Sequence, residues 1–232
     1  MSEPSDPLAW LVSLEGVASA FAAARDGIDV MLRDRGLRRT APELTGESLL
    51  IGAWASASLD GSESSLEDVR GSGGDAVARD AVRLSAELLS LVPVVRRAPL
   101  QAFARLHVLA GGSGQPVSGV ERLRSLAELL LADTAAPALL VASIVHADLM
   151  SVAPFPDRNG LVARAAERLV LVARGVDEKS LVVPEAGHLA LREAYESNLR
   201  GYATGSSAGI HAWLLYAAEA FTAGADASPL HS

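Results

Sequence analysis

Apolar residues recur at helical spacing along most of this 232-residue chain, and no segment has the alternating pattern of a β-strand. The first such run places Leu8, Leu11 and Leu14 on one face of a helix. Aromatic residues make up only 4% of the chain, so its core must be built largely from Ala, Leu and Val, which suits closely packed helices. We therefore expect an all-α fold of about eight helices with short connections.

The length allows one domain with a sizeable core. We expect an N-terminal tail and helices over 1–44, the main domain over 45–224 and a flexible tail over 225–232. The predicted helices include Leu8 to Ala24, Thr45 to Ala57, Asp75 to Leu91 (ending before Pro93) and Leu189 to Tyr202. Ser64 and Glu67 fit a capping box at the start of a short helix. Residues 110–119 are predicted to form a loop or a small β-hairpin flap.

Charge and hydropathy exclude several classes of protein. The net charge is −8 and no block is dense in Lys and Arg, which disfavours binding to nucleic acid or an anionic membrane. The longest apolar run, Ala135 to Pro154, contains His146 and Asp148 and is predicted to be a buried core helix, not a membrane span. The chain has no Cys, and Met1 to Pro7 lacks the basic region of a signal peptide, so we expect a cytoplasmic protein.

The stretch Ala153 to Arg164 predicts a phosphate-binding loop. Two prolines and Asn159-Gly160 shape a turn directly before an apolar helical run from Leu161 to Arg174. A helix N-terminus presents unpaired N–H groups and a partial positive charge, which favour an anion. Asp157 would oppose a phosphate there unless a divalent cation such as Mg²⁺ lies between them.

This stretch resembles the loop of the Fic (Fic/Doc, or Fido) family, which reads His-Pro-Phe-x-Asp/Glu-Gly-Asn-Gly-Arg-x-x-Arg. The matching residues are Pro154, Phe155, Asp157, Asn159, Gly160 and Arg164. The sequence departs from the motif at Ala153, Arg158 and Leu161, which stand where the family has His, Gly and Arg. Tyr195 and Leu199 also resemble the family's Tyr-x-x-x-Leu. The resemblance implies an all-α Fic-like bundle, with residues 110–119 as the candidate flap.

The resemblance also implies a function. Fic enzymes transfer AMP from ATP to a protein hydroxyl, and the loop His takes the proton from that hydroxyl. Here Ala153 has no group that can act as the base, a role worth about 10²–10⁴-fold in rate. The expected ligands are ATP and Mg²⁺. Asp157 would bind the metal ion, and the nucleotide would be bound by Asn159, Gly160, Arg158 and Arg164. A protein is expected as target or partner. Arg158 would supply the charge lost at Leu161 if its side chain points into the loop.

A second Fic-like element lies upstream. Many Fic proteins carry an inhibitory helix ending in Ser/Thr-x-x-x-Glu-Gly/Asn, whose Glu pairs with the last Arg of the motif. Ser56, Asp60 and Gly61 are similar in pattern and position, with Asp in place of Glu. The alternative is that Asp60-Gly61 only ends a helix in a turn.

Three functions follow from these patterns. The first is a nucleotide-binding protein deficient in AMP transfer, and the second is a non-enzymatic helical interaction module on a decayed Fic scaffold. The third is a transferase of altered chemistry, moving a phosphate or phosphocholine-like group. The histidines show no spacing typical of zinc ligands. His146 is interpreted as a buried core residue, and His107 is a weak candidate to replace the missing base. Nothing near His188 in the sequence indicates a partner for it.

Overall fold

The computed structural model describes residues 6–33 and 42–231, which form α-helices and loops with no β-strand. In chain order the α-helices are α1 Ala9–Val12, α2 Val17–Leu32, α3 Pro42–Leu59, α4 Leu66–Arg70, α5 Ala76–Glu87, α6 Val92–Val95, α7 Pro99–Leu109, α8 Val120–Leu131, α9 Ala138–Val152, α10 Asn159–Ala173, α11 Pro184–Ala190, α12 Arg192–Ala203 and α13 Ser207–Asp226. Two 3₁₀ helices, η2 Leu88–Leu91 and η3 Pro229–His231, complete the described elements. The all-α prediction is confirmed. The described residues form thirteen α-helices, more than the eight or so expected, and several of them are very short: α1, α4 and α6 have only 4, 5 and 4 residues.

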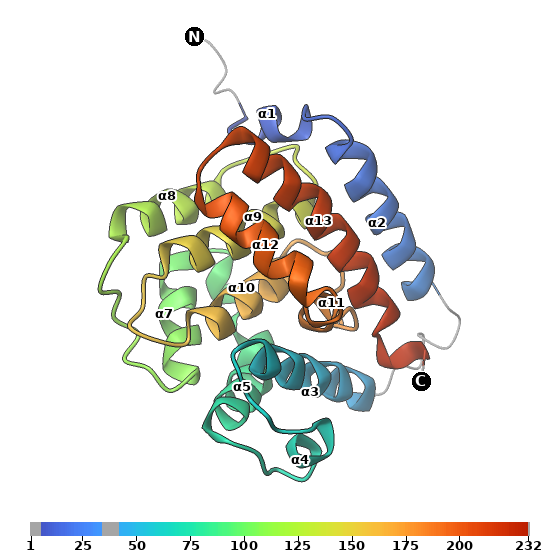
Figure 1. Ribbon diagram of the computed structural model, residues 1–232, viewed down its shortest axis with the longest axis vertical. Coiled ribbons are helices and arrows are strands. Elements are labelled where there is room, and N and C mark those ends of the chain that lie inside the picture. The colour runs from blue at the N-terminus through green and yellow to red at the C-terminus, as the bar shows by residue number, and fades with distance from the viewer. Residues whose placement is uncertain (1–5, 34–41, 232) are drawn as a thin grey trace.

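Helices α9 and α10 form the centre of the molecule (Figure 1). Every residue from Leu139 to Leu149 in α9, and from Gly160 to Val172 in α10, is buried. A helix that is apolar on all sides can be stable only when other elements surround it. Helices α3, α7 and α11 pack on α10, while α8, α12 and α13 pack on α9.

Arg168 ties α10 to its neighbours. Its guanidinium donates to Glu185 Oε2 at 3.0 Å, to the Ser180 carbonyl at 2.8 Å and to the Ser48 carbonyl at 3.2 Å. Both members of the Arg168–Glu185 ion pair are buried. The charges therefore hold α3 and α11 in place on α10, and α3 carries Ser56 to the edge of the motif loop.

Several helix ends differ from the sequence-based expectations. The helix predicted over Leu8 to Ala24 is broken between α1 and α2, where Gly16 has a φ of 75° that only glycine adopts readily. The helix predicted over Asp75 to Leu91 is α-helical only to Glu87, and its last four residues form η2. Helix α6 follows directly, because Pro93 lies in its first turn, where no N–H is needed. Helix α11 begins at Pro184 and a kink at Leu191 separates it from α12.

The capping box also lies one residue further along than predicted. The Ser65 hydroxyl accepts from the Asp68 N–H and the Asp68 side chain accepts from the Ser65 N–H, so these residues cap α4. The expected Ser64 hydroxyl instead accepts from the Asp75 N–H.

Residues 111–119 form a loop without strand pairing and not a hairpin. Val117 N–H donates to the Pro154 carbonyl at 2.8 Å, so the segment lies against the motif loop.

The predicted N-terminal tail is only partly described, because residues 1–5 and 34–41 lie outside the described residues. Residues 225–231 form the end of α13 and η3. No helix in the described part of the chain is both long and apolar enough to cross a membrane.

Candidate functional site

The loop between α9 and α10 is shaped by two residues with left-handed backbone. Ala153 ends α9 with a φ of 43°, and Arg158 precedes α10 with a φ of 55°. Asn159 closes the loop between them: its Oδ1 accepts from the Phe155 N–H at 3.0 Å, and its Nδ2 donates to the Phe155 carbonyl at 2.7 Å. Asn159 thus uses its amide to fix the shape of the loop.

Ala153 presents only a methyl group at the position of the expected base. Its carbonyl accepts from the Ser118 hydroxyl at 3.3 Å, which joins the 111–119 segment to the loop. Leu161, which stands where the family motif has its first Arg, is buried in the core. Neither of these two positions therefore carries a titratable or charged side chain.

Asp157 is held by a buried histidine that sequence reasoning treated as a weak candidate. His107 Nε2 lies 3.1 Å from Asp157 Oδ1, and His107 Nδ1 accepts from the Gly114 N–H at 3.1 Å. Because Nδ1 is the acceptor, the proton sits on Nε2 and points at Asp157. The imidazole also stacks on Phe155, with ring centroids 4.2 Å apart. Asp157 itself remains 64% exposed, so its carboxylate is accessible to a cation.

Arg158 points to α5. Its Nη2 lies 2.8 Å from Asp80 Oδ2 and its Nε donates to the same oxygen at 3.0 Å. Asp80 also pairs with Arg83 at 2.6 Å. Asp80 is thus shared between two guanidiniums, and in this structure the Arg158 side chain is bonded to α5.

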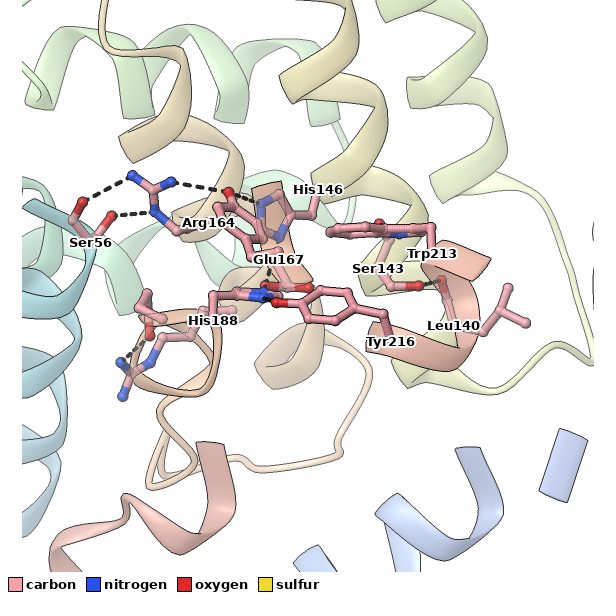
Figure 2. Close-up of polar contacts among 12 residues, drawn as sticks. Ser56, Leu140, Ser143, His146, Arg164, Glu167, His188, Trp213 and Tyr216 are labelled. Atoms are coloured by element: carbon pink, nitrogen blue, oxygen red, sulfur yellow. Dashed lines mark hydrogen bonds and ion pairs between the residues drawn. The ribbon is translucent and has the colours of Figure 1, made fainter. Parts of the chain in front are cut away.

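Arg164 is buried, and its guanidinium lies against Ser56 (Figure 2). Its Nε donates to Ser56 Oγ at 2.8 Å and its Nη2 donates to the Ser56 carbonyl at 3.0 Å. The same Nη2 forms an ion pair with Asp60 Oδ1, and Nη1 donates to the Tyr195 hydroxyl at 3.1 Å. The structure thus joins Ser56 and Asp60 to the last Arg of the motif.

Gly160 permits the approach of Asp60 to the start of α10. A Cβ at Gly160 would lie 2.2 Å from Asp60 Oδ1 and 2.9 Å from Arg164 Nη2, both well inside normal contact. The Asp60 carboxylate therefore occupies the space over the first turn of α10, where backbone N–H groups and the helix dipole favour an anion.

Behind Arg164 a chain of buried polar groups crosses the core. Tyr195 OH lies 2.9 Å from His146 Nε2, and His146 Nδ1 lies 2.9 Å from Glu167 Oε2. The chain then continues on the far side of the carboxylate, where His188 Nε2 lies 2.8 Å from Glu167 Oε2 and His188 Nδ1 lies 2.8 Å from Tyr216 OH. Figure 2 shows Glu167 between the two imidazoles, on the side of Arg164 away from Ser56. Glu167 Oε1 has no hydrogen-bond partner among the described residues.

Burial and the charge of Glu167 set the protonation of this chain. Burial lowers the pKa of His146 to about 4, against the opposing effect of Glu167, so this imidazole is neutral near pH 7. Burial acts to raise the pKa of Glu167, but the two histidines outweigh burial and lower it to about 2. The carboxylate is therefore ionised and receives N–H donors from both rings.

His146, Glu167 and His188 also form a group whose ligand atoms all lie within 4.8 Å of one another, a donor set that suits a divalent metal ion. However, every ring nitrogen already has a hydrogen-bond partner at 2.8–2.9 Å. We therefore interpret the group as a hydrogen-bonded network. The prediction that His146 is a satisfied core residue agrees with this geometry.

Sequence reasoning missed the partners of His188, because Glu167 and Tyr216 lie 21 and 28 residues away from it. The available signal was Glu167 itself, since a carboxylate inside an apolar helical run needs a buried partner.

Comparison with solved structures identifies the fold. A Fic family protein from Desulfovibrio desulfuricans G20 matches with a TM-score of 0.76 at 16% identity, over 92% of this chain and 74% of that chain. Fic-1 (residues 134–508) from C. elegans matches with a TM-score of 0.70 at 15% identity, over 90% of this chain and 71% of that chain. The E274G form of the same Fic-1 fragment matches with a TM-score of 0.67 at 16% identity, over 93% of this chain and 72% of that chain.

No family sequence model matches the chain, and no curated protein matches it by sequence. The resemblance to the Fic family is therefore confirmed at the level of the fold, which this chain shares with proteins of very different sequence.

Proposed function

We propose that this chain is a Fic-like nucleotide-handling protein whose phosphate site is closed by its own Asp60, and that it is deficient in AMP transfer. The observation that carries the proposal is the ion pair between Asp60 and the buried Arg164 at the start of α10. A carboxylate in this place uses the guanidinium and the helix N-terminus that an ATP phosphate would need. Displacing Asp60 would free both for a nucleotide.

The divalent cation in this proposal is Mg²⁺, held by Asp157. The fit rests on the exposed carboxylate, of which one oxygen accepts from neutral His107 while the side chain stays 64% exposed. Mg²⁺ commonly binds through one or two carboxylates together with substrate phosphates. The chain's own contribution is then to orient the phosphates with Arg164 and the first turn of α10.

Deficiency in AMP transfer follows from Ala153. A proton must leave the attacking hydroxyl, and the side chain at this position cannot accept it. His107 does not replace the base, because its Nδ1 is occupied by the Gly114 N–H and its Nε2 carries the proton toward Asp157. His146 is enclosed in the core.

The experiment is calorimetric titration with ATP and Mg²⁺ of four proteins: wild type, Asp60→Gly, Asp60→Gly with Arg164→Ala, and Glu63→Gly. Glu63 is an exposed acid three residues beyond Asp60 and controls for loss of charge alone. We expect Asp60→Gly to bind at least about tenfold more tightly than wild type, since a charge-assisted contact no longer competes with the ligand. Glu63→Gly should bind like wild type, and Arg164→Ala should abolish the gain.

Absence of binding in all four proteins at millimolar ATP would reject the proposal. If Asp60→Gly transfers labelled AMP to a co-incubated protein, the proposed deficiency in AMP transfer is wrong, while the proposed nucleotide site stands.

The second candidate is a non-enzymatic interaction module. It is favoured by exposed apolar side chains on α7, α8 and the 111–119 segment, namely Leu100, Val108, Val117, Val120 and Leu131. This function would leave partner binding intact in Asp157→Ala and give no shift in melting temperature with nucleotide.

A further inference from the structure

The contact between Arg164 and Tyr195 has only one consistent proton arrangement. A guanidinium can donate hydrogen bonds but cannot accept them. The Tyr195 oxygen must therefore accept from Arg164 Nη1 across their 3.1 Å contact. The hydroxyl proton is then free to point at the other neighbour, His146 Nε2, which lies 2.9 Å away.

The same reasoning fixes His146. If its Nε2 accepts from Tyr195, the proton of the neutral imidazole must sit on Nδ1. Nδ1 lies 2.9 Å from Glu167 Oε2, an ionised carboxylate that can only accept. Donors and acceptors therefore alternate without conflict from Arg164 through Tyr195 and His146 to Glu167.

His188 completes the order from the other side. Its Nε2 donates to Glu167 Oε2 at 2.8 Å, which leaves Nδ1 to accept from the Tyr216 hydroxyl at 2.8 Å. Glu167 thus receives one donor from each imidazole, and the two tyrosines have equivalent places at the two ends. They differ in one respect, because only Tyr195 contacts Arg164.

We propose that Tyr195 is the positioning residue for Arg164, with its hydroxyl directed by Glu167 through His146. The proposal rests on the proposed function, in which Arg164 receives a phosphate once Asp60 has left. Departure of Asp60 removes the ion pair at Nη2 and leaves Ser56 on Nε and Nη2. Tyr195 then keeps Nη1 in place, so the guanidinium does not have to be reordered when the ligand binds.

The two tyrosines provide a matched test. Tyr195→Phe and Tyr216→Phe each delete one buried hydroxyl that is hydrogen-bonded to a histidine of the same network. Both are made in the Asp60→Gly background, and ATP with Mg²⁺ is titrated by calorimetry. We expect Tyr195→Phe to weaken binding by about tenfold or more, the scale of one hydrogen bond to a charged group, and Tyr216→Phe to bind like Asp60→Gly alone.

Equal losses in both variants would overturn the proposal, because they would report general damage to the network. Retained affinity in Tyr195→Phe would overturn it as well.

A second measurement uses the unmodified protein and needs neither a variant nor a nucleotide. Nitrogen-15 NMR of the imidazoles distinguishes the two neutral tautomers. We expect His146 to carry its proton on Nδ1 and His188 to carry its proton on Nε2. A proton on His146 Nε2 would overturn the proposal, even where ATP binding to Asp60→Gly succeeds. Failure of Asp60→Gly to bind, with the expected tautomers present, would reject the nucleotide function and keep the directed hydroxyl.

Discussion

Arg158 holds a left-handed backbone at the position where the Fic motif has glycine. With a φ of 55° it lies in a region that side chains other than glycine enter at a cost of about 1–2 kcal/mol. Its ion pair with Asp80 is partly exposed, at 28% and 16%, and such pairs typically contribute up to about 1 kcal/mol. The free-energy cost of the backbone strain and the stabilisation from the ion pair are therefore similar in magnitude and opposite in sign.

Two substitutions separate these effects. Arg158→Ala removes the ion pair and keeps the backbone strain, while Arg158→Gly removes both. We expect the Gly variant to be more stable than the Ala variant by about 1 kcal/mol in the free energy of unfolding. Urea denaturation of the two variants measures the difference. An Ala variant as stable as the Gly variant would show that the loop carries no strain at this position.

The sequence indicated some residues of the site better than others. The contact of Asp60 with Arg164 could be anticipated because the inhibitory pattern and the motif are both short and local. The orientation of Arg158 could not, since its partner Asp80 lies 78 residues away on a different helix. The same holds for Glu167 and the two histidines, which come from three separate helices.

At the scale of the elements, the close contact of α11 and α13 depends on two glycines. A Cβ at Gly187 would lie 2.0 Å from the Ala220 carbonyl oxygen and 2.8 Å from the Gly224 nitrogen. These are backbone atoms, which cannot move without displacing the helix. The contact places His188 beside Tyr216, so it also sets the far end of the buried network.

Gly187→Ala is therefore expected to destabilise the protein by about 2 kcal/mol or more, the upper part of the range for overpacking a core. Gly27→Ala is the matched control, because Gly27 is exposed on α2 and a Cβ there has no atom within 4 Å. The control should gain about 0.5–1 kcal/mol from helix propensity. Thermal unfolding of both variants tests the contrast, and similar effects in the two would refute the close approach of α11 and α13.

Helical periodicity was sufficient to predict the fold class and the long central helices, because their apolar positions repeat over several turns. It was insufficient at α1, α6 and α11, where helices of 4, 4 and 7 residues are too short for a periodic signal. The boundaries of these helices are set by Gly16 and by prolines in first turns. The sequence around these residues indicates a break in the helix but does not indicate in which direction the next helix runs.

For the whole molecule, one consequence of the buried network is sensitivity to acid. Burial holds the pKa of His146 at about 4, below its usual 6.5. Between pH 6.5 and pH 4, His146 is therefore protonated in the unfolded chain and neutral in the folded chain. Burial acts to raise the pKa of Glu167, but the electrostatic attraction of the two histidines and their hydrogen bonds outweigh burial, and the pKa is about 2 in place of 4.5. In both cases the unfolded state binds more protons, so stability is lost as the pH falls.

The two groups therefore act in successive windows. Stability should begin to decrease below about pH 6.5 through His146 and continue down to about pH 2 through Glu167, with each group contributing up to about 1.4 kcal/mol per pH unit. Urea denaturation at pH 7, 6, 5 and 4 measures the first window. His146→Asn should be less stable at pH 7 and show a smaller decrease from pH 6.5 to 4, whereas His231→Gln, a change at an exposed C-terminal residue, should behave like wild type. Wild-type stability that stays constant from pH 7 to 5 would contradict a neutral His146 in the folded core.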